Sequence, residues 1–136
     1  MNFPVSIKGV CFLEGAVLLL KNDRAEWELP GGRLESSAEG AEEALQREFW
    51  EEAGLVVNVV SIVDSWLFEV LPDKYVFIVT YLVEPQPELP IKISGEHTNY
   101  LLADPEKLPL NLPQGYVRSV KKAIELRQAI VGRSDG

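Results

Sequence analysis

Apolar residues along this chain fall into several runs, which are separated by turns of glycine, proline and charged residues. Two runs near the amino terminus, residues 5–13 and 15–20, predict a pair of strands. Residues 55–70 and 75–83 predict a long hairpin with its turn at residues 71–74. The pattern therefore predicts a β-sheet built from the amino-terminal and central parts of the chain.

Between these groups of strands, the apolar spacing changes to that of a helix over residues 37–53. Ser36 and Glu39 are spaced as a capping box at its start, and Gly54 stands where a left-handed carboxyl-terminal cap is expected. The predicted buried stripe consists of Ala41, Ala44, Leu45, Phe49 and Ala53. The sequence thus predicts a helix whose apolar face packs on the sheet.

The remaining segments complete an α/β pattern. Residues 116–130 have near-helical spacing with Gly132 just past their end, which predicts a carboxyl-terminal helix. Residues 84–90 contain three prolines and predict a loop, and a short strand is expected over residues 91–93. With 136 residues and 46% hydrophobic content, the chain is expected to form one domain, residues 1–136.

The predicted central helix concentrates carboxylates on one face. Glu48, Glu51 and Glu52 lie at i, i+3 and i+4, where like charges repel by roughly 0.2–0.5 kcal/mol per pair. They also lie at the negative end of the helix dipole. A divalent cation such as Mg²⁺ would make this arrangement favourable, because Mg²⁺ takes carboxylates and substrate phosphates as ligands. The alternative is a solvated acidic face, which is what most charge runs are.

The segment before this helix favours the metal site. Residues 27–29 predict the end of a strand, and Pro30-Gly31-Gly32 predict a turn. Glycines allow the backbone to approach a ligand or metal closely. A strand, a glycine loop and an acidic helix together predict a corner that binds phosphate and metal.

At these residues the sequence resembles the Nudix hydrolases, whose signature is a glycine, a spaced glutamate and then Arg-Glu-apolar-x-Glu-Glu-x-Gly-apolar. Residues 47–55, REFWEEAGL, match the second half without a mismatch, and seven residues separate Glu39 from Arg47 as the signature requires. Six residues lie between Gly32 and Glu39 where the family usually has five, and Ala38 replaces the usual glycine. This departure concerns the shape of the loop more than the metal ligands.

The resemblance implies the Nudix fold, a mixed β-sheet sandwiched between α-helices. It also implies cleavage of a pyrophosphate linkage with Mg²⁺, or with Mn²⁺ in its place. The expected metal ligands are Glu48, Glu51 and Glu52, and the carbonyl of Gly31 or Gly32 is a further expected ligand. By the same resemblance, Glu51 and Glu52 count as catalytic residues.

Other residues of the signature have structural interpretations. Arg47 lies four residues from both Glu43 and Glu51, so i,i+4 pairing would orient these carboxylates. Glu39 stays open between the capping box and contact with the substrate. The residues of the signature expected to have structural roles are Gly31, Arg47 and Gly54.

The general base is expected on the loop of residues 94–100, SGEHTNY. Many family members carry a glutamate on a loop facing the helix. Glu96 stands at the matching place, so we expect it to contact metal or water as a catalytic residue; a solvated loop carboxylate is the alternative. His97, the only histidine, could transfer protons near neutral pH, but a lone loop histidine is usually incidental.

A small nucleotide is the expected substrate. Candidates for stacking on a base, each of which could equally be an ordinary packing residue, are Trp66, Phe68, Tyr75, Phe77 and Tyr100. Candidates for contact with phosphate, each of which could instead be a surface charge, are Lys8, Lys21, Arg33 and Lys74. The preferred substrate contacts are Arg33, Glu39 and Tyr100.

Composition limits the cellular compartment and the binding partners that we expect for this protein. The net charge of −8 argues against a long nucleic acid, while bound cations would still allow a polyphosphate ligand. Cys11, the only cysteine, lies in an apolar run and is expected to be a buried thiol. The chain shows neither a signal peptide nor a membrane span, so we expect a cytoplasmic protein without a membrane partner. Val56-Val57 or the proline loop could serve as a homodimer interface.

Three functions are compatible with these patterns. The first is a metal-dependent hydrolase of a nucleoside diphosphate derivative, such as ADP-ribose, a nucleoside triphosphate or a dinucleoside polyphosphate. The second is a sensor module with the same fold that binds a nucleotide without cleaving it. Such modules typically lose glutamates of the signature, and this chain keeps all three, so the hydrolase is favoured. RNA-cap removal is a distant third, because no basic groove for a long RNA is apparent.

Overall fold

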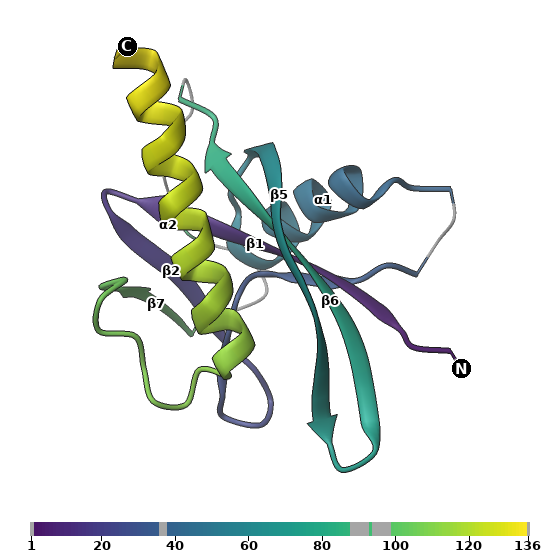
Figure 1. The fold of residues 1–136 in the computed structure, drawn as a ribbon. Coiled ribbons are helices and arrows are strands. Elements are labelled where there is room, and N and C mark those ends of the chain that lie inside the picture. The colour runs from purple at the N-terminus through teal and green to yellow at the C-terminus, as the bar shows by residue number, and fades with distance from the viewer. Residues whose placement is uncertain (1, 36–37, 88–92, 94–98, 136) are drawn as a thin grey trace.

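The computed structural model describes residues 2–35, 38–87, 93 and 99–135, with side chains up to residue 132. In this part of the chain, seven strands and two helices follow one another (Figure 1). Their order is β1 (Val5–Leu13), β2 (Ala16–Lys21), β3 (Trp27–Glu28), β4 (Gly31–Arg33), α1 (Ala41–Ala53), β5 (Val57–Leu71), β6 (Lys74–Pro85), β7 (Tyr100–Ala103) and α2 (Gln114–Asp135). One helix is thus inserted among the strands, and the other ends the chain.

The strands form one mixed sheet in the order β3-β2-β1-β6-β5, with β4 also paired to β1 and β7 also paired to β2. β1 is the central strand, parallel to β6 and antiparallel to β2 and β4 at its two ends. Both faces of β1 are buried, and so are its two polar residues, Ser6 and Lys8. The predicted mixed sheet is confirmed.

The two helices cover opposite faces of the sheet (Figure 1). The core beneath α2 includes Val10, Ile78, Tyr116 and Val120. The core beneath α1 includes Ile7, Cys11, Leu45 and Phe49. Successive residues of a strand point to opposite faces, which is why Val10 and Cys11 belong to different cores. The predicted sandwich is confirmed. Neither helix, over the residues described, has an apolar stretch long enough to cross a membrane.

Cys11 lies in the core beneath α1 and is fully buried. Burial raises the pKa of its thiol to about 12, so the thiol stays protonated at neutral pH. The prediction of a packed core cysteine is confirmed.

α1 begins at Ala41, later than the sequence predicts. Its N-cap is Gly40, and no side chain caps the helix. The predicted capping box is therefore wrong, because the carboxylate of Glu39 binds Arg47 instead; Ser36 lies outside the described residues. The other end agrees with the prediction. Gly54 has a left-handed φ of 69°, and its N–H donates to the carbonyl of Trp50 at 2.9 Å.

Several further segments differ from the prediction. Gly31 and Gly32 form a strand rather than a turn, because both pair with β1. β6 continues through Pro85, since a proline at the end of a strand leaves the ladder intact. Gly132 lies within α2 rather than after it. β7 was not predicted, and the strand expected at 91–93 lies mainly outside the described residues.

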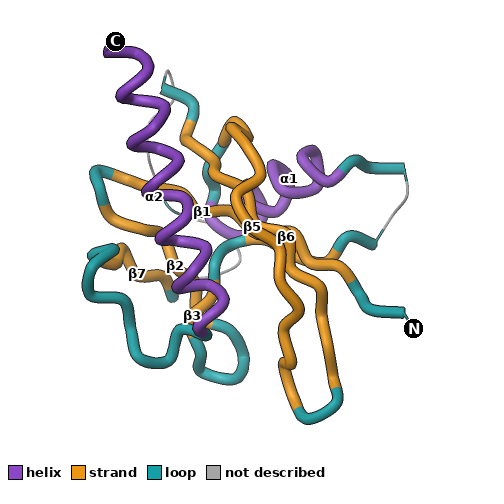
Figure 2. The backbone as a smooth tube through the Cα atoms, viewed as in Figure 1, coloured by secondary structure: helices purple, strands orange, loops and turns teal. Residues whose placement is uncertain are grey.

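The β5–β6 hairpin agrees with the prediction and extends beyond the helices (Figure 2). Its turn lies at Pro72-Asp73, where Asp73 adopts a left-handed φ of 63° that aspartate tolerates. The pairing has three register shifts, and such bulges bend a strand and increase its twist. The tip of the hairpin forms one wall of the cleft described below.

Candidate active site

Two glutamates of α1 meet strand β4 where the helix joins the sheet. We call Gly31, Gly32, Glu48 and Glu52 the acidic corner. The backbone N–H of Gly31 donates a hydrogen bond to Oε1 of Glu52 at 3.2 Å. Glu52 is only 6% exposed, whereas the side chain of Glu51 is 43% exposed. Of the three predicted metal ligands, Glu48 and Glu52 face the sheet and Glu51 lies at the rim.

Close approach requires both glycines of the acidic corner. A Cβ atom on Gly32 would lie 2.6 Å from Cδ of Glu48, so a larger residue would push this carboxylate away. A Cβ atom on Gly31 would lie 2.0 Å from the carbonyl oxygen of Ile7, and Gly31 has a φ of 144° that other residues rarely adopt. The glycines therefore admit a carboxylate of α1 against the backbone of β4.

The carboxylate of Glu52 is buried beside the partly exposed carboxylate of Glu48. The pKa of Glu52 is raised to about 8. Burial is the largest cause; the charge of Lys8 opposes it, and the hydrogen bond and charge of Glu48 add to it. Two adjacent carboxylates cannot both be ionised in such a site without a counter-charge. The pair is therefore suited to hold a shared proton or a cation.

Arg47 organises the rim of the acidic corner. Its guanidinium binds both carboxylate oxygens of Glu39, with Nε at 3.2 and 3.0 Å. It also binds Glu48 at 3.3 Å and Glu51 at 3.1 Å. The predicted pair with Glu51 is confirmed, but among the described residues Glu39 takes the place predicted for Glu43. The hydrogen bond to Glu39 is the main reason why the pKa of Arg47 is raised. Glu39 thus acts through Arg47, and its contact with the substrate stays a prediction.

The acidic corner fits a metal ion that uses few protein ligands. Among the described residues, no group of three or more His, Cys, Asp or Glu side chains is arranged to hold a metal. Mg²⁺ commonly keeps several waters and takes only one or two carboxylates plus substrate phosphates, and Glu48 and Glu52 can supply these two carboxylates. Glu51 is drawn towards Arg47. Glu96 and His97 lie outside the described residues.

A cleft with basic side chains adjoins this corner, because Lys8 pairs with Gly31 and Arg33 follows Gly32. Its inner cavity, of about 160 Å³, is lined by residues that include Ser6, Lys8, Arg24, Glu28, Arg33, Phe68 and Tyr116. Its outer cavity, of about 700 Å³, is lined by residues that include Phe3, Arg24, Arg33, Asp73, Lys74 and Tyr75. The residues that line both are Arg24, Arg33, Val70 and Val76. The two cavities therefore adjoin each other.

Lys8 connects the acidic corner with the inner cavity. It is 6% exposed, and its Nζ lies 3.8 Å from Oε1 of Glu28. Burial works to lower the pKa of Lys8, but neighbouring negative groups outweigh burial and leave the pKa raised. The groups that are negative at neutral pH are Glu28, Glu52 and Glu48; Tyr116 adds to them only once its phenol ionises at high pH, because burial raises the pKa of Tyr116. Lys8 therefore places a positive charge inside the cavity at neutral pH.

Three of the four predicted phosphate contacts line the cleft, namely Lys8, Arg33 and Lys74. Lys21 lines neither cavity; its Nζ lies 5.4 Å from the centre of the Trp27 ring. Arg24 joins the cleft although the sequence analysis did not select it. A turn brings it there, in which the backbone N–H of Arg24 donates to Oδ1 of Asn22 at 2.9 Å. The signal in the sequence that could have identified Arg24 is Asn22 followed by charged residues. This pattern is typical of a turn but does not show to which side of the sheet the turn projects.

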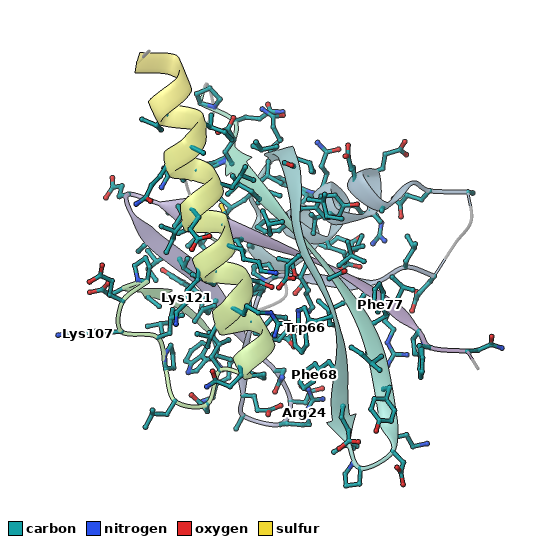
Figure 3. The ribbon with its side chains drawn as sticks, viewed as in Figure 1. Arg24, Trp66, Phe68, Phe77, Lys107 and Lys121 are labelled. Atoms are coloured by element: carbon teal, nitrogen blue, oxygen red, sulfur yellow. The ribbon has the colours of Figure 1, made fainter. Side chains whose placement is uncertain are left out.

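Phe68 is the predicted stacking residue that lines the inner cavity. Trp66 packs behind it, with ring centres 4.9 Å apart, and also contacts Tyr116 at 5.0 Å. A Cβ atom on Gly115 would lie 2.4 Å from the Trp66 ring, so this indole is fitted against the start of α2. Figure 3 shows Phe68 and Arg24 at this same end of the molecule. Trp66 therefore supports Phe68 and does not line the cavity.

The other predicted aromatic contacts lie elsewhere. Tyr75 lines the outer cavity. Phe77 pairs with Val5 and Leu67 on the sheet and is 37% exposed, but it lines neither cavity. Tyr100 begins β7 and is 45% exposed, and it also lines neither cavity. Contact between Tyr100 and the substrate stays a prediction.

Known proteins resemble this chain in sequence and in fold. The family model described as the NUDIX domain matches residues 4–123. An 8-oxo-dGTP diphosphatase of Proteus vulgaris is 36% identical over 77 residues, which are 56% of this chain and 67% of that protein. The structure of a MutT protein from Methanosarcina mazei is 26% identical, with a TM-score of 0.75, and the match covers 93% of this chain and 96% of that one. An ADP-ribose pyrophosphatase from Streptococcus suis has the same fold at 20% identity, with a TM-score of 0.71 and coverage of 93% and 92%.

Proposed function

The chain belongs to the Nudix hydrolase family, and from that premise we propose that it hydrolyses the phosphoanhydride bond of a nucleoside diphosphate derivative with Mg²⁺ or Mn²⁺. The observation that carries this proposal is the acidic corner beside a basic cleft. Glu48 and Glu52 supply paired carboxylates, and the adjoining cavities supply Lys8, Arg24 and Arg33. Carboxylates for a metal next to cations for phosphate are the requirements of phosphoryl chemistry.

The residues of the site divide the chemical work. Glu48 and Glu52 would hold the metal ion, which when bound neutralises charge on phosphate oxygens and acidifies an attacking water. Arg24, Arg33 and Lys8 bind phosphate oxygens and stabilise the negative charge that develops as the P–O bond breaks. These groups are set in place before the substrate binds, since Lys8 is on the central strand and Arg33 ends β4.

Glu51 and Glu96 complete the proposal as catalytic groups. Glu51 lies at the rim of the acidic corner, where its carboxylate is held 3.1 Å from a terminal nitrogen of Arg47. A carboxylate oriented in this way can accept a proton from water near Glu48 and Glu52. Glu96 is assigned by the resemblance to the family alone.

The substrate is proposed to be a nucleotide whose base or sugar enters the inner cavity against Phe68. The names of related proteins point to 8-oxo-dGTP and ADP-ribose as compounds to test first. Both carry a phosphoanhydride next to a purine nucleoside. Glu28 also lines the inner cavity, and a carboxylate there can accept hydrogen bonds from N–H groups of a base or from sugar hydroxyls.

The test is hydrolysis of a panel of nucleoside diphosphate derivatives with Mg²⁺, with Mn²⁺ and with EDTA. Glu52→Gln is expected to lower kcat/KM by about a thousandfold, which corresponds to several kcal/mol of lost transition-state stabilisation. Glu42→Gln is the matched control, because Glu42 is an exposed glutamate in the first turn of the same helix. Metal-independent turnover would overturn the proposal. Binding of nucleotides without any turnover, equal in both variants, would identify the sensor module instead.

A further inference from the structure

Two further cavities adjoin each other along α2. The first, of about 610 Å³, lies between the second half of α2, the β1–β2 turn at Gly15 and the segment that follows β7. The second, of about 490 Å³, lies between the first half of α2 and the same segment. Both are lined by Pro105, Glu106 and Ile124, so they form one groove, which we call the α2 groove. Among the described residues, none that lines this groove also lines the cleft beside the acidic corner.

The residues that α2 contributes to the groove follow the spacing of a seam between two helices. Intervals of three and four residues alternate along this stripe, as they do between the a and d positions of a coiled coil. The stripe consists of Gln114, Val117, Lys121, Ile124, Gln128 and Val131. Every second residue of the stripe is apolar and β-branched. At 1.5 Å per residue the stripe is about 26 Å long, so a second helix can lie along it.

The end of α2 projects from the body of the molecule (Figure 1). Among the described side chains of this helix, the last that is fully buried belongs to Ala123, and residues 127–132 are all exposed. The helix nevertheless continues to Asp135. Most of the stability of a helix in a protein comes from the packing of its apolar face. Val131, which is 54% exposed, therefore belongs to a part of α2 that gains stability when a partner covers it.

We propose that the α2 groove is a homodimer interface, in which the α2 helices of two copies lie antiparallel, each in the groove of the other. A second copy fits because the same chain carries both the groove and the projecting helix end. A two-fold axis near Ile124 makes the contact reciprocal, so the first cavity of one copy faces the second cavity of its partner. Val131 then contacts the partner's Leu108 and the partner's Leu110, which is fully exposed in the single chain.

Charges beside the stripe complement one another across this dimer. Lys121 and Glu125 lie before and after Ile124 in the sequence, and both line the second cavity with exposed side chains. Figure 3 shows Lys121 on the side of α2 that faces the segment carrying Lys107. An antiparallel pair centred near Ile124 brings Lys121 of each copy against the partner's Glu125. Among the described residues, neither side chain forms an ion pair within its own chain, so each is available to the partner.

Sedimentation velocity tests the dimer. The wild-type protein is expected to sediment as a dimer at about 100 µM, with a micromolar dissociation constant. Val131→Glu is expected to raise this constant by about tenfold or more, because it introduces a charge into the buried seam. Ile62→Glu is the matched control. Ile62 is similarly exposed, at 56%, but it lies on the edge strand β5, so its change should leave the dissociation constant unaltered.

An exchange of charges tests the antiparallel arrangement. Glu125→Lys gives a groove with two lysines, and Lys121→Glu gives a groove with two glutamates, so each variant alone is expected to dimerise about tenfold more weakly. A mixture of the two variants should form mixed dimers, which native mass spectrometry detects when one variant is labelled with heavy nitrogen. An effect within one helix cannot produce this recovery, because each variant keeps its own like-charged pair in the mixture.

A wild-type protein that stays monomeric at about 100 µM overturns the proposal. So does a dimer that Ile62→Glu dissociates and Val131→Glu does not, since the interface would then lie at the β5 edge. Single charge variants that dimerise as the wild type does, or a mixture without mixed dimers, overturn the antiparallel pairing. Thermal unfolding checks that each variant is folded, and Val131→Ala takes the place of Val131→Glu if that variant is not. Hydrolysis of nucleotides should be the same in all variants, so failure of the dimer and failure of the proposed function are distinguishable.

Discussion

Two carboxylates on different elements are nearly excluded from solvent, but their pKa values are shifted in opposite directions. Asp64 on β5 is 9% exposed, and Glu52 on α1 is 6% exposed. Yet the pKa of Asp64 is lowered, whereas the pKa of Glu52 is raised to about 8. Burial acts to raise the pKa of both groups, and the partners that each carboxylate receives differ.

Asp64 receives a full set of donors from α2. Lys122 binds one oxygen at 3.0 Å, and Ser119 and Arg118 bind the other at 3.0 and 3.3 Å. Ser119 also lies 3.3 Å from the hydroxyl of Thr80 on β6. Burial works to raise the pKa of Asp64, but the hydrogen bonds from Lys122 and Ser119 and the two positive charges outweigh it. This cluster ties the hairpin to the terminal helix.

Glu52 is compensated less completely. Lys8 and the N–H of Gly31 favour its charged form, but burial and the neighbouring carboxylate of Glu48 prevail. A buried acid that the fold leaves short of positive charge is destabilising unless a ligand supplies the charge. The fold therefore neutralises Asp64 internally and leaves Glu52 less compensated, as the proposed metal site requires.

Removing Asp64 should have the largest effect on stability. Asp64→Ala removes the carboxylate that Ser119 binds and separates Lys122 and Arg118 from their counter-charge, so we expect the free energy of unfolding to fall by about 3 kcal/mol. Urea denaturation measures this free energy of unfolding. Asp23→Ala, at an exposed position, is the control and should change stability by less than about 0.5 kcal/mol. A loss below about 1 kcal/mol in Asp64→Ala would show that the cluster is not a clamp.

Glu52→Gln should raise the stability of the metal-free protein, whereas the loss of Asp64 lowers it. In EDTA at pH 8, this change removes a buried charge and retains hydrogen bonding to Glu48, so stability should rise by about 2 kcal/mol. The sign follows from the raised pKa. The folded wild-type protein binds the extra proton between about pH 4.5 and 8, so its stability falls as the pH rises through this window.

The gain in Glu52→Gln should therefore grow from pH 5 to pH 8, as measured by thermal unfolding at each pH. Saturating Mg²⁺ should reverse the ranking, because only the wild-type protein gains binding energy from the metal. A variant that is less stable than the wild type in EDTA at pH 8 would contradict the comparison.

Gly32→Ala should weaken metal binding while it changes the stability of the fold only slightly. The added Cβ at position 32 meets the end of the flexible Glu48 side chain, which can turn away. The free energy of unfolding should therefore fall by only about 1 kcal/mol. The apparent affinity for Mg²⁺ should nevertheless fall by about tenfold or more, as followed by metal-dependent thermal shift. The control is Gly132→Ala, where an added Cβ meets nothing within 4 Å; it should stabilise α2 slightly and leave metal affinity intact.

The pH dependence of Asp64 should be the smallest effect and the mirror image of that of Glu52. Because its pKa is lowered by folding, the stabilisation from the ionised form is complete above about pH 4 and is lost as the pH falls through the folded pKa. The stability difference between the wild type and Asp64→Asn should therefore be constant from pH 8 to 5 and shrink below pH 4. A difference that grows with falling pH would contradict the lowered pKa.

Local elements were predictable to the extent that neighbouring residues determine them. The hairpin with its turn at Pro72-Asp73 and the end of α1 at Gly54 follow from turn and cap chemistry within a few residues. The start of α1 did not, because Arg47, eight residues away, takes the carboxylate of Glu39 that was expected to cap the helix. β7 was missed because its four residues gain strand geometry only by pairing with β2.

The chemical inventory of this protein follows from its amino-acid sequence: a signature with paired glutamates, the glycines before it, and an apolar pattern of strands around one helix. How this inventory is used depends on the three-dimensional fold. Lys8, Arg33 and Lys74 meet in one cleft because β4 and β6 both pair with β1, and the turn between β2 and β3 adds Arg24. Likewise, Glu52 is buried and binds the backbone of the sheet at Gly31. Its neighbour Glu51 is exposed and binds Arg47. Burial and charge depend on contacts between distant residues, and a spacing along the chain does not contain them.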